Sequence, residues 1–125
     1  MKNNNKIFLG EFIASCFLVM VIVGSGIMAE NLTNDNAIRL LANTIATGAG
    51  LFVLITAFAN ISGAHLNPFV SLSMYLTKRI KGKELLTFIP AQILGCLLGV
   101  MLANVFFEHS ICLLYTSPSP RDLVI

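Results

Sequence analysis

The stretch SGAHLNPFVSLSMYLT, residues 62–77, decides the fold of this chain, because it is apolar but opens with Gly, His, Asn and Pro. Asn67 is a good helix cap, and Pro68 is favoured at the first helical position, where its missing N–H is no loss. The helix that follows would be about 15 Å long, which is roughly half the thickness of a bilayer. We therefore expect a half-helix over residues 68–77, with an ordinary loop as the alternative.

Three long stretches that are almost free of charge flank this segment, at residues 7–29, 40–61 and 85–107. A helix of about 22 residues crosses the roughly 30 Å hydrocarbon core of a bilayer. Of the 125 residues, 56% are hydrophobic and only 11% are charged, whereas about 25% are charged in a soluble domain. The sequence therefore predicts an all-α membrane protein with three transmembrane helices and one re-entrant half-helix.

A secretory signal peptide is the alternative interpretation of residues 7–29, because Lys2 and Lys6 precede this apolar run. The run is longer than the roughly 7 to 15 residues of a signal-peptide core, and it contains Glu11. No small-residue cleavage motif clearly ends it. We therefore interpret it as the first transmembrane helix.

The basic residues predict the orientation of the chain in the membrane. Lys2 and Lys6 precede the first helix, and residues 78–83 carry four more basic side chains, whereas residues 30–39 carry one. Lys and Arg are enriched in cytoplasmic loops. We therefore expect a multi-pass protein of the cell (inner) membrane with a cytoplasmic N-terminus, in which the half-helix starts near the midplane and returns to the cytoplasm.

Small residues recur at every fourth position on two of the expected helices, and such stripes let helices approach closely in lipid. They are Ala42, Ala46 and Gly50 on the second helix, and Ala91, Gly95, Gly99 and Ala103 on the third. These stripes predict helix packing and do not by themselves indicate a function.

The sequence shows no pattern of an enzyme or a metalloprotein. Cys16, Cys96 and Cys112 lack the spacing of a disulfide framework or a metal site. Paired carboxylates, Cys/His pairs and Ser/His/Asp sets are missing as well, and the net charge of +2 does not indicate a nucleic-acid partner. We therefore expect no catalytic residues, no metal, no cofactor and no bound nucleic acid.

A family resemblance emerges at SGAHLNP, residues 62–68, which is similar to the first Asn-Pro-Ala loop of the aquaporins, also called major intrinsic proteins. The residues GEF at 10–12 and AQILG at 91–95 resemble the first and third helices of that family. The order of helix, helix, half-helix and helix also matches over residues 7–107. The resemblance implies one of the two inverted repeats of an aquaporin-like right-handed bundle, here over residues 1–110.

Two further phrases, VGSGIMAE at residues 23–30 and ANTIATG at residues 42–48, resemble a bacterial branch of the family. The resemblance implies a passive channel for water or small neutral solutes, which forms a homotetramer in the lipid bilayer when it is full length. A broken-helix secondary transporter and a non-conducting small membrane subunit are the alternatives. A transporter coupled to ions would place more ionisable groups in its spans, where only Glu11 is found.

The resemblance also implies roles for particular residues. Glu11 would accept hydrogen bonds from backbone N–H groups of the loop, and Gln92 would support it. The side chain of Asn67 would donate to a passing molecule, while the positive end of the half-helix dipole disfavours cations. Carbonyl groups that line the pore would come from Gly63, Ala64, His65 and Leu66.

The chain departs from the family pattern at two positions. The motif formed by Asn67, Pro68 and Phe69 ends in Phe where the family usually has Ala, so the surroundings must repack around a larger side chain. In an ungapped comparison, Thr47 takes the selectivity-filter position of the second helix, where water-selective members often carry Phe and glycerol facilitators Trp. The smaller Thr47 favours small neutral solutes, such as polyols and metalloid acids.

The tail of the chain changes character at residue 111. Residues 111–125 read ICLLYTSPSPRDLVI, which does not resemble the next segment of the family. We interpret this tail as a sequencing or translation artefact, with a natural disordered tail as the alternative. The second Asn-Pro-Ala loop and the filter arginine are not found in the sequence, so we expect this chain to be an incomplete channel.

Overall fold

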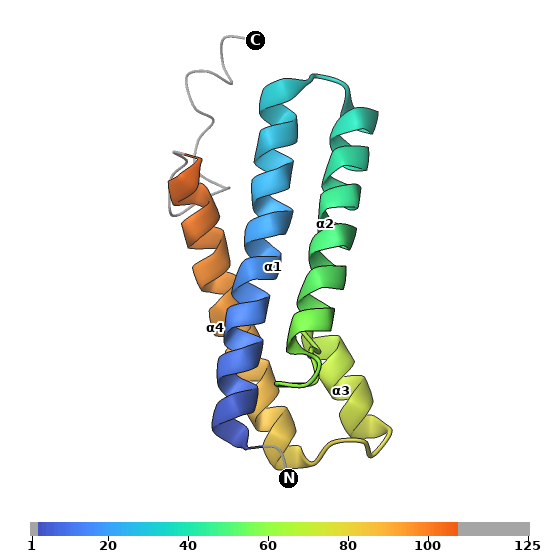
Figure 1. Ribbon diagram of the computed structural model, residues 1–125, viewed down its shortest axis with the longest axis vertical. Helices are drawn as coiled ribbons and strands as arrows, with labels where there is room; N and C mark the ends of the chain where they lie inside the picture. The colour runs from blue at the N-terminus through green and yellow to red at the C-terminus, as the bar shows by residue number, and fades with distance from the viewer. Residues whose placement is uncertain (1–2, 108–125) are drawn as a thin grey trace.

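The computed structural model describes residues 3–107, and this part consists of four α-helices without strands. They are α1 (Asn4–Leu32), α2 (Asn36–Phe58), α3 (Pro68–Leu76) and α4 (Gly82–Phe106) (Figure 1). Three of them, α1, α2 and α4, are long and apolar enough to cross a membrane. The predicted fold class, an all-α membrane protein with three spanning helices and one short helix, is confirmed. The tail at residues 111–125 lies outside the described residues.

The helix ends differ by a few residues from those of the apolar stretches that predicted them. The helix expected over residues 40–61 begins at Asn36, because the Asp35 carboxylate accepts hydrogen bonds from the N–H groups of Ala37 (2.8 Å) and Ile38 (3.3 Å). It ends at Phe58, where the chain turns into the loop. Polar caps of this kind lie outside the hydrocarbon, so an argument from apolar length alone misses them.

The first helix, α1, is the centre of the arrangement. It packs against both α2 and α4, whereas α3 packs against α4. Within residues 3–107, α2 packs against no other helix than α1. Figure 1 shows α2 and α4 on opposite sides of α1, with α3 near the end of the molecule where the chain begins. The half-helix is therefore placed by α4 and by the loop that precedes it.

Glycines bring α4 into direct contact with the backbone of α1. A Cβ atom added at Gly95 would lie 2.3 Å from the carbonyl oxygen of Phe12, and one added at Gly99 would lie 2.4 Å from that of Cys16. Only glycine permits an approach this close. All members of the small-residue stripe on α4 are buried, namely Ala91, Gly95, Gly99 and Ala103.

The corresponding stripe on α2 packs only in part. Ala42 is exposed, and Ala46 and Gly50 are half-buried. At Gly50 an added Cβ would lie 3.0 Å from the side chain of Val21, so this glycine does face α1.

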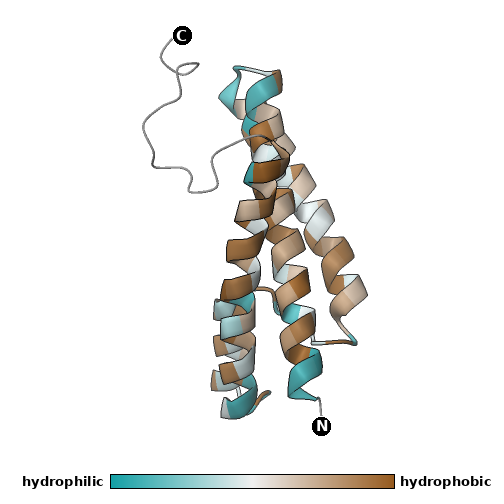
Figure 2. Ribbon diagram, turned by 90° about the vertical axis from the view of Figure 1, so that its left-hand side faces the viewer, coloured by the Kyte–Doolittle hydropathy of each residue, from teal (hydrophilic) through white to brown (hydrophobic). Residues whose placement is uncertain are grey.

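Figure 2 shows the apolar residues along the middle of the helices and the hydrophilic ones toward the ends. This distribution suits helices that cross a bilayer.

We expect Gly95→Ala to lower the free energy of unfolding by about 1–3 kcal/mol, because the new methyl group would collide with backbone that cannot move aside. Gly48→Ala is the matched control, since nothing lies within 4 Å of a Cβ at that position. The measurement is reversible unfolding of the chain in mixed micelles, followed by circular dichroism. Equal stability of the two variants would show that α1 and α4 are farther apart than described.

Candidate functional site

The segment between α2 and α3 is non-helical backbone beside the spanning helices. It contains Gly63 at a φ of 99°, Ala64 at 52° and Leu66 at 57°. Left-handed φ angles at non-glycine residues cost about 1–3 kcal/mol each and persist only where the surroundings impose them. The loop is therefore held in its shape by contacts with the rest of the protein.

The carboxylate of Glu11, on α1, is fully buried and accepts four hydrogen bonds. Its Oε1 atom accepts from the hydroxyl of Ser62 (2.6 Å) and the backbone N–H of His65 (3.1 Å). Its Oε2 atom accepts from the backbone N–H of Leu66 (2.8 Å) and the side-chain amide of Gln92 (2.9 Å). A single side chain thus satisfies two backbone N–H groups of the loop in a region where lipid offers no acceptor.

Gln92, on α4, joins this carboxylate to the half-helix. Its Nε2 atom also lies 2.9 Å from the hydroxyl oxygen of Ser71, on α3. Because Nε2 carries two hydrogens, it can donate one to Glu11 and one to Ser71. The same Ser71 oxygen lies 2.9 Å from His65 Nδ1. The network therefore connects α1, the loop, α3 and α4.

The ring of His65 is fixed by a second contact, with Phe88 of α4. The two rings stack with their centroids 4.0 Å apart and an interplanar angle of 7°. Together with the bond to Ser71, this contact ties the ring to α3 and α4. Sequence reasoning missed three members of the site, Ser62, Ser71 and Phe88. Phe88 lies four residues before Gln92 and so shares a helix face with it, whereas Ser71 is the buried residue of the half-helix that Asn67 caps.

The loop approaches α1 because Gly10 leaves room for it. A Cβ atom added at Gly10 would lie 3.0 Å from both Ile61 Cγ2 and Ser62 Cβ. The side chain of Leu66 is buried in a cluster with Ala14 and Leu54. Small and apolar residues of α1 and α2 thus seat the loop beside the Glu11 carboxylate.

Asn67 caps the half-helix. Its Oδ1 atom accepts a hydrogen bond from the N–H of Phe69 (2.9 Å), and Pro68 occupies the first turn. The residue as a whole is exposed. The ring of Phe69 is 77% exposed. Its expected repacking stays a prediction.

Thr47 lies apart from this network, on the face of α2 that packs against α1. One turn before it, Asn43 donates hydrogen bonds from Nδ2 to the Ile22 carbonyl (2.8 Å) and the Ser25 hydroxyl (3.0 Å). The hydroxyl of Thr47 is buried and has no hydrogen-bond partner within residues 3–107. The structure does not bring Thr47 together with the loop, and its filter role stays a prediction.

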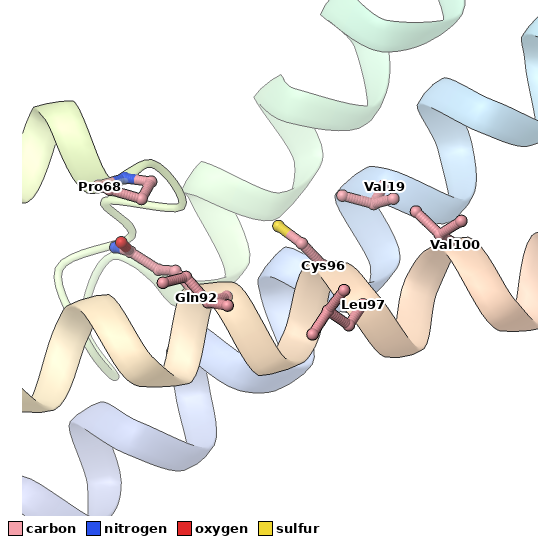
Figure 3. A pocket seen from close by; sticks show the side chains of 7 residues that line it. Val19, Pro68, Gln92, Cys96, Leu97 and Val100 are labelled. Atoms are coloured by element: carbon pink, nitrogen blue, oxygen red, sulfur yellow. The ribbon is translucent and has the colours of Figure 1, made fainter. Parts of the chain in front are cut away.

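A cavity of about 260 Å³ lies between α1, α4 and the start of α3 (Figure 3). The buried Oε1 atom of Gln92 has no hydrogen-bond partner in the described part of the chain. The cavity is lined by Val19, Pro68, Gln92, Ile93, Cys96, Leu97 and Val100.

Within residues 3–107 no cluster of His, Cys, Asp or Glu could hold a metal ion.

Comparisons with known proteins match most of the chain. The family model "Major intrinsic protein" matches residues 1–121. The aquaglyceroporin AqpS of Rhizobium meliloti is 45% identical over 100 residues, which are 80% of this chain and 43% of that protein. Because the family match runs past residue 110, the interpretation of residues 111–125 as foreign sequence stays a prediction.

Less similar relatives match a comparable share of the chain. Aquaporin A of Dictyostelium discoideum is 37% identical over 94 residues, which are 75% of this chain and 34% of that protein. Aquaporin NIP1-1 of Arabidopsis thaliana is 30% identical over 106 residues, which are 83% of this chain and 35% of that protein. The chain thus spans less than half the length of these curated relatives.

Replacement of Glu11 should release the loop. In Glu11→Ala the four donors lose their acceptor, and each buried donor left unpaired costs about 1–3 kcal/mol. We therefore expect hydrogen exchange at the N–H groups of His65 and Leu66 to accelerate at least about tenfold, measured by mass spectrometry on the chain in micelles. Glu11→Gln should fall between Glu11→Ala and the wild type, because it keeps one acceptor but loses the charge-assisted bonds.

Phe12→Leu is the control for this experiment, since it alters the neighbouring residue without changing an acceptor. Its loop N–H groups should exchange as slowly as those of the wild type. Slow exchange at Leu66 in Glu11→Ala would mean that another group holds the loop.

Proposed function

This chain belongs to the major intrinsic protein family, and from that membership we propose that it supplies one half of a passive channel for water or small neutral solutes. The observation that carries the proposal is the non-helical loop beside the spanning helices, which the buried Glu11 carboxylate holds in place. Backbone of this kind must be buried in protein or line water, because lipid cannot satisfy its polar groups. Members of this family are channels, and we propose no catalytic activity.

The loop and the half-helix would act on a permeating molecule through hydrogen bonds. The carbonyls of residues 63–66 would accept hydrogen bonds in succession, in place of those that the molecule leaves behind in water. At the end of this ladder Asn67 would donate from Nδ2, since its Oδ1 is committed to the N–H of Phe69. The N-terminus of α3 carries about half an elementary positive charge. It therefore opposes cations but not neutral molecules.

The permeating molecules would include neutral solutes larger than water. Thr47 is smaller than the aromatic residues expected at this position in water-selective and glycerol-conducting members. The relative at 45% identity is named an aquaglyceroporin, which supports a glycerol-like solute. Metalloid acids belong to the same class of small neutral molecules and are included in the proposal.

A second, inverted repeat would complete the pore on the side of the open cavity. Pro68 and the side chain of Gln92 line this cavity, and the ring of Phe69, next to Pro68 in the chain, is exposed. The complete protein would lie in the cell (inner) membrane as a homotetramer, with its N-terminus in the cytoplasm. Water or small solutes and the lipid bilayer would be its partners.

We expect a chimera of residues 1–107 and the second half of Rhizobium meliloti AqpS to conduct glycerol when it is reconstituted in liposomes. The 125-residue chain alone should give no more flux than empty vesicles, because one half-helix leaves the pore wall open. In the chimera, Asn67→Ala should lower the flux at least about tenfold, while Asn60→Ala, a matched change on an exposed residue before the loop, should not. Stopped-flow light scattering measures both.

Saturable flux from the chain alone would contradict the half-channel and favour a pore made by several copies. A folded chimera that conducts nothing would contradict the channel function itself.

The orientation can be tested by cysteine labelling in intact cells, after replacement of the native cysteines by serine. Cysteines at Asn3 and Gly82, which lie at the basic end, should be protected from an impermeant thiol reagent, and one at Asn34 should react. All three positions are exposed, so burial does not explain protection. Reaction at Gly82 from outside would reverse the proposed orientation.

A further inference from the structure

The turn between α3 and α4 carries the densest positive charge of the described chain. Its basic side chains all project from the surface. Glu84 is the one acidic residue beside them, and its carboxylate accepts a hydrogen bond from the backbone N–H of Lys81 (2.8 Å). We refer to four residues as the basic turn, namely Lys78, Arg79, Lys81 and Lys83.

The basic turn is not needed to satisfy the end of the half-helix. The carbonyl of Met74 accepts from the backbone N–H of Arg79 (2.8 Å), and that of Tyr75 accepts from the N–H of Lys78 (2.9 Å). The hydroxyl of Thr77 donates to the carbonyls of Ser73 and Met74. The last carbonyls of α3 thus have backbone and hydroxyl donors, and the basic side chains remain outside this capping arrangement.

At the other end of the molecule, the basic side chain of Arg39 forms hydrogen bonds within the chain. Arg39 donates from Nε to the carbonyl of Thr33 (2.7 Å) and from Nη2 to that of Glu30 (3.3 Å). This arginine is therefore occupied in holding the loop between α1 and α2. Within residues 3–107, by contrast, the four side chains of the basic turn form no ion pair. Their charge is available to a partner outside the chain.

Exposed apolar side chains border the basic turn. Leu76, at the end of α3, is 69% exposed, and Leu86, in the first turns of α4, is 76% exposed. The ring of Tyr75 lies against the start of α4, 3.8 Å from a Cβ built on Gly82. Figure 1 shows the turn at the end of the spanning helices, beside the start of α1. A small soluble anion has no apolar part that could contact Leu76 and Leu86.

We propose that the basic turn binds the headgroup of an anionic phospholipid, with an acyl chain of that lipid against Leu76 and Leu86. The phosphate group supplies the negative charge that the four side chains lack within the chain. The position beside the starts of the spanning helices α1 and α4 places the turn at headgroup depth (Figure 1). This binding is additional to the channel function and does not depend on it.

The test is native mass spectrometry of the delipidated 125-residue chain, titrated with phosphatidylglycerol or with phosphatidylcholine of the same acyl composition. The wild type should bind phosphatidylglycerol at least about tenfold more tightly. The double variant K81Q/K83Q should lose at least about tenfold of this affinity, because each basic residue near an anionic surface changes binding roughly fivefold. Its affinity for phosphatidylcholine and its circular dichroism should not change.

Arg39→Gln is the control at the opposite end, where it removes one positive charge, whereas K81Q/K83Q removes two. It should keep the preference for phosphatidylglycerol. Equal loss in Arg39→Gln and K81Q/K83Q would reduce the effect to net charge and overturn the proposal, as would wild-type affinity in K81Q/K83Q. Full competition by an excess of inorganic phosphate would show a site for free phosphate in place of a lipid site.

Discussion

The hydrogen bonds of the Glu11 carboxylate are the interaction on which the rest of the structure depends. They join α1 to the loop at Ser62, His65 and Leu66, and to α4 through Gln92. A loop beside spanning helices cannot turn to lipid for acceptors, so its shape requires a partner within the protein. The glycine contacts serve the same arrangement, because the approach of Gly95 to Phe12 brings α4 within reach of the carboxylate.

Several parts of this arrangement could be predicted from the sequence, because they depend on local patterns. The charge-free stretches indicate the three spanning helices, and Asn67 followed by Pro68 indicates the start of the half-helix. Glu11 could be singled out because it is the one acidic residue within the apolar stretches at 7–29, 40–61 and 85–107. The ends of the helices could be predicted less accurately, because capping residues such as Asp35 lie in polar segments outside the apolar stretches.

The remaining features depend on residues that are far apart in the chain. The hydroxyl of Ser71 bridges Gln92 and His65, and the ring of Phe88 stacks on His65. Nothing in the spacing of a single helix predicts that these groups meet. The buried Oε1 of Gln92 lacks a partner within residues 3–107, and so does the hydroxyl of Thr47. Buried polar atoms normally have partners in the protein or in ordered water.

The most direct test of the central claim is a dipolar-recoupling distance in lipid bilayers by solid-state NMR, between the backbone nitrogen of Leu66 and the carboxyl carbon of Glu11. With only these two sites labelled with ¹⁵N and ¹³C, the account predicts strong dephasing, as expected for an N···O separation of 2.8 Å. The same label on the nitrogen of Leu86, six residues before Gln92 on α4, gives the background. Dephasing at Leu66 no greater than this background would contradict the account.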